Sequence, residues 1–223
     1  MRAEFAIRAV TFDVGGTLIR PWPSVGHVYA EVASQNGLQI SPELLNRQFA
    51  KAWKGFKGFN HTKADWGRMV DLTFEDLAQT PPSRSFFDQL YSRFSTPEVW
   101  HIYPDVHPAL ELLRNRGLRL AVVSNWDERL RPLLHSLELD RYFEEIVISC
   151  EVGVPKPSAV IFSRKAEVLR LNPGEILHVG DDPLADAEGA QAAGFKTVFL
   201  DRAGASGPGR VRDLRDLEHH ISV

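Results

Sequence analysis

The sequence predicts an α/β fold, a doubly wound parallel sheet interrupted by four inserted helices. After about residue 104, short apolar runs alternate with segments whose apolar residues recur at helical spacing, as in a parallel sheet with crossover helices. Between about residues 21 and 100, apolar residues fall at helical spacing and no convincing strand occurs. We therefore expect one domain from residues 1–19 and 102–223, and a helical domain from residues 20–101.

The expected strands are short buried runs rich in β-branched and aromatic residues. The first is Ala9–Phe12, and the others cover residues 118–123, 146–149, 176–179 and 197–200. Helical periodicity fills the intervals between them at residues 106–113, 130–137, 161–169 and 184–193, and a short terminal helix is expected at 211–221.

The inserted region shows amphipathic periodicity in four stretches. Ser41 and Pro42 precede the second stretch and fit the N-cap and first helical position. Short connections favour a small helical bundle, with most of the aromatic residues in its core. The stretches cover residues 25–32, 45–56, 66–77 and 87–94.

The composition is that of an ordinary globular protein, with a formal net charge of −3. This charge disfavours nucleic-acid binding, and no apolar run approaches the ~20 residues of a membrane helix. Cys150 is the only cysteine, so no intrachain disulfide or cysteine metal cluster can form, and we expect it in the core at a strand end. Because the N-terminus lacks the apolar segment of a secretory signal, we expect a cytoplasmic location.

Asp13 comes directly after the first expected strand, and Gly15 and Gly16 follow it. Ligands of open α/β sheets bind at the carboxyl ends of the strands, so this carboxylate is a candidate nucleophile or metal ligand. The glycines allow a sharp turn and a close approach of the backbone to a bound group.

Further polar residues follow the other strands, and a parallel sheet would bring them to the same edge. Clustered carboxylates suit Mg²⁺, while an ammonium and a hydroxyl can hold phosphate oxygens. A carboxylate nucleophile can also form an aspartyl-phosphate. The sequence thus predicts a phosphoryl-transfer site that includes Ser124, Asn125, Lys156, Asp181, Asp182 and Asp186.

These segments together resemble the haloacid dehalogenase superfamily of hydrolases. Residues 13–18 resemble its first motif, Ser124–Asn125 its second, Lys156–Pro157 its third and residues 180–186 its fourth. The resemblance implies a Rossmann-like core, here residues 1–19 and 102–223, and a helical cap, here residues 20–101.

The resemblance also implies residue roles. Asp13 would be the nucleophile, and Lys156 would neutralise charge on it and on the phosphate. Ser124 and Asn125 would bind the substrate together with Gly16 and Thr17. The Mg²⁺ ligands would be Asp13, the Gly15 carbonyl, Asp181 and either Asp182 or Asp186.

One position departs from the family pattern. Phosphatases of the family carry a second aspartate, a general acid and base, where this chain has Gly15. Such groups typically contribute ~10²–10⁴-fold to the rate, so we expect a slow phosphatase unless another group substitutes. His27, His61 and His101 are candidates that the sequence does not place.

Three functions remain open at this point. The first is Mg²⁺-dependent hydrolysis of a small phosphorylated metabolite by a monomer or homodimer. The second is metal-independent 2-haloacid dehalogenation, which Gly15 favours and which Asp181 and Asp182 disfavour, because metal-free dehalogenases have Ser and Asn there. The third is phosphate binding or regulation with little turnover.

Overall fold

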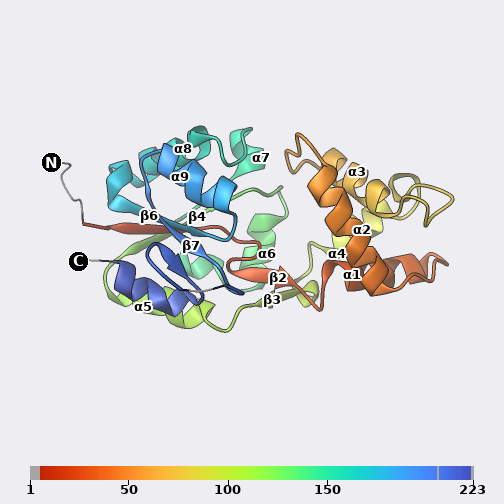
Figure 1. Cartoon of the computed structure of the whole chain (residues 1–223), viewed down its shortest axis with the longest axis horizontal. Coiled ribbons are helices and arrows are strands. Elements are labelled where there is room, and N and C mark those ends of the chain that lie inside the picture. The colour runs from red at the N-terminus through yellow and green to blue at the C-terminus, as the bar shows by residue number, and fades with distance from the viewer. Residues whose placement is uncertain (1–5, 205, 222–223) are drawn as a thin grey trace. The chain divides into compact units, whose positions relative to one another are not determined.

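The chain forms two compact units, a core unit and a helical unit (Figure 1). The computed structural model describes residues 6–204 and 206–221. The core unit holds the chain up to Ile19 and again from Ile102 onward, and the helical unit holds Arg20–His101. Within the described ranges, no helix combines the length and apolar character that a membrane crossing requires.

A six-stranded parallel sheet forms the centre of the core unit, in the order β5-β4-β1-β6-β7-β8, and confirms the predicted fold class. The central strands are almost entirely buried, since helices cover both faces of a parallel sheet. The strands are β1 (Ala9–Phe12), β4 (Arg119–Ser124), β5 (Glu145–Ile148), β6 (Ile176–Gly180), β7 (Lys196–Leu200) and β8 (Arg210–Val211).

Helices α8 and α9 lie on one side of the sheet, and α5 lies on the other (Figure 1). Ser158 caps α8 as predicted, its hydroxyl accepting a hydrogen bond from the Val160 amide. The α-helices are α5 (Val106–Asn115), α6 (Leu130–Ser136), α7 (Ser149–Val152), α8 (Ala159–Leu169) and α9 (Gly189–Ala192). Short 3₁₀ turns cover η3 (Asp140–Tyr142) and η4 (Pro173–Glu175).

Three local expectations were wrong. Ser149, expected to end a strand, begins α7, and Cys150 is a half-buried residue of that helix. Val211 belongs to β8, because its backbone pairs with β7, and the terminal helix is the 3₁₀ helix η6 (Leu214–His220). The helix expected at 184–193 is divided into a π-helical turn, η5 (Pro183–Glu188), and α9.

The helical unit contains four α-helices, as the periodicity predicts. Tyr29 lies at the centre of its core, stacked on Phe74 and in edge contact with Phe49 and Phe94. Aromatic packing of this kind supports the interpretation of the aromatic pattern as bundle core. The helices are α1 (Val25–Gln35), α2 (Pro42–Gly55), α3 (Lys63–Thr73) and α4 (Phe87–Arg93), with 3₁₀ turns η1 (Pro82–Arg84) and η2 (Pro97–Val99).

Two short strands that the sequence did not predict lie where the chain passes between the units. They are β2 (Ile19–Pro21) and β3 (Trp100–Ile102), which form a two-stranded sheet. Ser41 caps α2 with Pro42 at its first position, as expected.

Candidate active site

Asp13 and Ser124 meet at the carboxyl edge of the sheet. Strands β1 and β4 are parallel neighbours with Phe12 opposite Val122, so both chains leave the sheet on the same side. The Ser124 hydroxyl donates a hydrogen bond to Asp13 Oδ1 at 2.9 Å. Asp13 is 8% exposed, which leaves its carboxylate reachable but largely desolvated.

Lys156 is inserted between two carboxylates. Its Nζ donates to Asp13 Oδ1 at 2.6 Å and to Asp186 Oδ1 at 2.5 Å. Asn125 fixes the backbone that carries it, because its Nδ2 donates to the Lys156 carbonyl at 3.0 Å and its Oδ1 accepts from the Lys156 amide at 2.7 Å. Asn125, expected to bind substrate, here uses its amide group to position Lys156.

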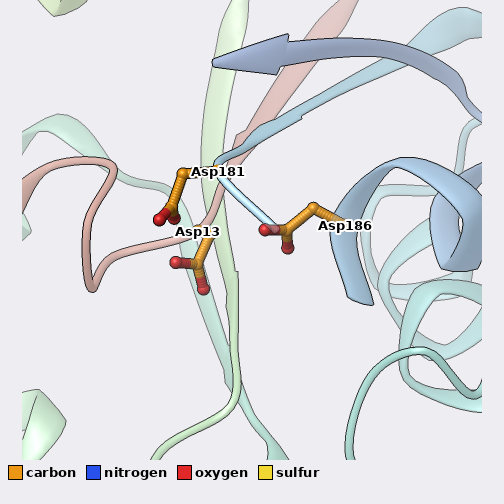
Figure 2. Close-up of side chains that lie close together, drawn as sticks. All are labelled: Asp13, Asp181 and Asp186. Atoms are coloured by element: carbon orange, nitrogen blue, oxygen red, sulfur yellow. The ribbon is translucent and has the colours of Figure 1, made fainter. Parts of the chain in front are cut away.

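The carboxylates of Asp13, Asp181 and Asp186 lie close together (Figure 2). One carboxylate oxygen of each lies within 4.8 Å of the others. The Thr17 hydroxyl donates to Asp181 Oδ1 at 3.0 Å, and the Asp182 amide donates to Asp186 Oδ2 at 3.0 Å. These contacts orient the carboxylates from the first loop and from the start of η5.

Asp182 lies outside this cluster and has a local role. Its Oδ1 accepts hydrogen bonds from the amides of Leu184 at 2.9 Å and Ala185 at 2.8 Å, so it is the N-cap of η5. The structure therefore groups Asp186, not Asp182, with Asp13 and Asp181.

Glycines make room for the carboxylates. A Cβ on Gly16 would lie 2.2 Å from Asp181 Oδ2, and its φ of +81° also favours glycine. A Cβ on Gly180 would lie 2.2 Å from the Asp186 Cγ. Each glycine is thus needed for close approach of one carboxylate.

Gly15 has a different environment, beside an aromatic ring. A Cβ on Gly15 would lie 3.2 Å from the Trp126 ring. The next two residues, Gly16 and Thr17, offer their carbonyls to the Arg202 guanidinium at 3.3 and 2.6 Å. The Arg202 guanidinium therefore holds the backbone of the loop that follows Asp13 through these two hydrogen bonds.

Sequence reasoning missed a buried histidine that supports the cluster. His178 Nε2 lies 3.1 Å from Asp186 Oδ1, and its Nδ1 lies 2.9 Å from the Thr11 hydroxyl. Both ring nitrogens of His178 therefore have a polar partner, one on β1 and one on η5. The only sequence signal was one polar residue in each of two apolar strands, and the two residues are register partners.

Burial and the neighbouring charges shift the pKa values of the clustered side chains. Burial raises the pKa of Asp13, and Asp186 adds to this while Lys156 opposes it. Burial, with Asp13 and Asp186 nearby, raises the pKa of Asp181 to about 7. Burial alone would lower the pKa of Lys156, but the charges of Asp13 and Asp186 outweigh it and raise that pKa. Burial alone would raise the pKa of Asp186, but Lys156 and the contact with His178 outweigh it and lower that pKa.

These residues fit a divalent cation. The carboxylates are hard oxygen ligands of the kind that Mg²⁺ prefers. Three carboxylates lie close together, and the single ammonium group of Lys156 contacts only two of them, Asp13 and Asp186. A cation held by Asp13, Asp181 and Asp186 would supply the missing positive charge.

The three histidines named as candidates to replace the absent acid belong to the helical unit. His27 Nδ1 lies 2.8 Å from the Ser24 hydroxyl, and His101 packs against Trp22. His61 packs against Phe59.

The chain belongs to the haloacid dehalogenase-like hydrolase family, because residues 7–194 match that family's model. It is 33% identical over 230 residues to human haloacid dehalogenase-like hydrolase domain-containing protein 3, covering 98% of this chain and 91% of that protein. It is 32% identical over 213 residues to glyceraldehyde 3-phosphate phosphatase of Methanopyrus kandleri, covering 88% of this chain and 84% of that protein.

Solved structures agree with this assignment. A haloacid dehalogenase-family phosphatase from Thermococcus onnurineus superposes with a TM-score of 0.70 at 27% identity, covering 96% of this chain and 97% of that one. Dehalogenases share the fold at 19–23% identity, with TM-scores of 0.68–0.77. The protein is therefore a hydrolase of this family.

Proposed function

We propose that the protein is a Mg²⁺-dependent phosphomonoester hydrolase acting on a small phosphorylated metabolite. The observation that carries this proposal is the cluster of the Asp13, Asp181 and Asp186 carboxylates, two of which bind the Lys156 ammonium group. The phosphatase relatives support it.

Asp13 is the proposed nucleophile. Ser124 and Lys156 both hold its Oδ1, so we assign the attack on phosphorus to Oδ2. The Oδ2–phosphorus bond forms as the bond to the leaving oxygen breaks, giving an aspartyl-phosphate. Water then attacks phosphorus and releases inorganic phosphate, one proton and the Asp13 carboxylate.

The other residues stabilise charge and geometry. Lys156 supplies a fixed positive charge beside the nucleophile, and Ser124 supplies a hydroxyl. Bound Mg²⁺ would neutralise charge on the phosphate oxygens, with Asp13, Asp181 and Asp186 as its protein ligands. Residues 20–101 are proposed as the cap domain, since the chain enters them directly after the loop that follows Asp13.

Dehalogenation is less compatible with this site. A halocarboxylate is an anion, and it would approach three clustered carboxylates with unfavourable charge. Gly15 alone favours that reaction, whereas the acidic cluster has a direct use in binding a cation.

The test is release of inorganic phosphate from a panel of aryl, sugar and nucleotide phosphates. It is run with Mg²⁺ and with chelator, and Asp13→Asn is the blank. We expect release that needs Mg²⁺ and disappears in the variant. Release that survives the chelator would contradict the proposal, and halide release from short haloacids would favour the dehalogenase instead.

A further inference from the structure

Gly15 and Trp126 lie against each other beside the nucleophile. Gly15 is two residues beyond Asp13, and Trp126 is two residues beyond Ser124, whose hydroxyl binds Asp13. A Cβ on Gly15 would lie 3.2 Å from Cζ3 and 3.9 Å from Cη2 of the indole. The ring therefore lies in tight contact with the position that a Cβ on residue 15 would take.

The backbone at Gly15 does not itself require glycine. Gly16 has a φ of +81°, whereas Gly15 is not among the residues with positive φ. Gly15 also differs from Gly16 in what faces it, since a Cβ on Gly16 would collide with a carboxylate at 2.2 Å. At position 15 the neighbour is the Trp126 ring.

The backbone of Trp126 is fixed. Its amide donates to the Ser149 hydroxyl at 3.1 Å, and its carbonyl accepts from that hydroxyl at 3.1 Å and from the Cys150 amide at 3.3 Å. The preceding residue, Asn125, is bonded to Lys156 at both ends of its amide. The indole is thus positioned by the same loop that positions the lysine.

We propose that Trp126 is a specificity-determining residue that directs the enzyme to phosphate compounds with a planar, low-pKa leaving group, such as aryl, enol or acyl phosphates. This inference rests on the proposed phosphatase function. Gly15 carries no side chain that could donate a proton, and the Trp126 indole lies beside it, so we assign the leaving group to this face. A planar group can pack on the ring, and one that is stable as an anion needs no proton.

The chemistry balances without an acid on this face. The Asp13 oxygen bonds to phosphorus, and the leaving oxygen departs with the electron pair of the broken bond as an anion. Water then cleaves the aspartyl-phosphate, and its proton goes to solvent. An alkoxide leaving group, by contrast, is a strong base and would leave slowly without protonation.

The experiment compares kcat/KM across a series of substituted phenyl phosphates and the alkyl ester β-glycerophosphate, all with Mg²⁺. For the wild type we expect kcat/KM to fall steeply as the pKa of the leaving group rises. Trp126→Ala should lower kcat/KM for the phenyl series several-fold, mainly through KM, and lower kcat/KM for β-glycerophosphate by a clearly smaller factor. Trp126→Phe should keep most of the preference for the phenyl series, because it retains an aromatic ring.

Two double variants test whether an acid at position 15 can act once the Trp126 ring is removed. Gly15→Asp combined with Trp126→Ala should raise hydrolysis of β-glycerophosphate by on the order of 10²-fold and flatten the dependence on leaving-group pKa, as a general acid would. Gly15→Ala with Trp126→Ala adds the Cβ without the acid and should not. Circular dichroism and the thermal midpoint check that each variant is folded.

The outcomes separate this inference from the proposed function. A wild type that hydrolyses every ester with equal kcat/KM keeps the phosphatase and overturns the role of Trp126. The same holds if Trp126→Ala, still folded, lowers alkyl and aryl hydrolysis equally. A wild type that releases no phosphate from any substrate overturns both.

Discussion

The Lys156 ammonium nitrogen lies 2.6 Å from the Asp13 carboxylate, and both groups are buried. The same nitrogen reaches Asp186 at 2.5 Å, so one cation stabilises two of the clustered carboxylates. Removing it would leave buried negative charges without a partner, which is far more costly than replacing a complete ion pair. We therefore expect Lys156 to contribute both to turnover and to the stability of the fold.

For Lys156→Met we expect kcat/KM to fall by on the order of 10²-fold or more, comparable to the loss of a transition-state charge stabiliser. We also expect a lower thermal midpoint without metal. Because Mg²⁺ would replace the lost positive charge, it should raise the midpoint of Lys156→Met more than that of the wild type. Calorimetry with Mg²⁺ and with chelator measures this, and an equal response of both proteins would contradict the shared-charge argument.

Asp181 and Asp182 are adjacent in sequence and should respond differently to substitution. Asp181→Asn should weaken Mg²⁺ binding, because Asp181 lies in the carboxylate cluster. Asp182→Ala should cost about 1 kcal/mol of stability as a lost N-cap, and Asp182→Asn should restore it, because asparagine caps equally well. Titration with Mg²⁺ and thermal unfolding separate the two effects. Equal loss of Mg²⁺ affinity in both Asp182 variants would make Asp182 a ligand.

Local patterns were enough for the fold class and for the residues that meet at the sheet edge. Asp13 and Ser124 follow apolar runs, and parallel strands bring such ends together. His178 and Thr11 were missed because their contact depends on which strands are neighbours and in what register, which is a non-local property. Strand β8 was missed because a two-residue strand has no periodicity.

The choice between Asp182 and Asp186 depended on the turn that carries them. Asp182 and Asp186 both follow strand β6, and their positions on a regular α-helix would not determine which of them lies in the carboxylate cluster. The chain forms the π-helical turn η5, and Gly180 leaves the space into which Asp186 fits. Backbone geometry of this kind is set by tertiary packing, so the sequence left both acids as candidates.

Arg202 should position the loop that follows Asp13. Its guanidinium donates to the Gly16 and Thr17 carbonyls, pairs with Asp105 at 3.0 Å and packs on the Tyr103 ring. Lysine cannot reproduce this set of planar contacts. We expect Arg202→Lys to lower kcat/KM by roughly 10–100-fold, the range expected when a reacting group is misplaced by a fraction of an ångström to 1 Å.

The control for Arg202 is Arg210, which makes a surface ion pair with Asp201 at 3.3 Å. Exposed pairs of this kind contribute about 0–1 kcal/mol, so Arg210→Lys should leave kcat/KM near the wild-type value. Added guanidinium should restore part of the activity of Arg202→Ala. Wild-type turnover in Arg202→Lys would show that the loop does not need this side chain.

Lys165 is a buried amine whose effect on stability should depend on pH. Its side chain is fully buried on α8, and its Nζ has no hydrogen-bond partner among residues 6–204 and 206–221. Burial lowers its pKa to about 7, with Arg119 and Arg131 also lowering it and Glu145 and Glu144 opposing. The amine is therefore easier to deprotonate in the folded protein than in the unfolded chain, where its pKa is 10.5.

The sign of the pH effect follows from proton counts. Between about pH 7 and 10.5 the unfolded chain binds the Lys165 proton more strongly, so this residue makes stability rise with pH across that window. The loss of folding stability caused by the buried Lys165 charge is largest below pH 7, where it amounts to several kcal/mol at about 1.4 kcal/mol per pKa unit, and it vanishes above pH 10.5.

Lys165→Met should therefore raise the thermal midpoint at pH 7 and lose that advantage towards pH 10. Lys51→Met, at an exposed lysine, should change the midpoint little at either pH. An advantage of Lys165→Met that is equally large at both pH values would mean that packing, and not the buried charge, sets the stability at this position.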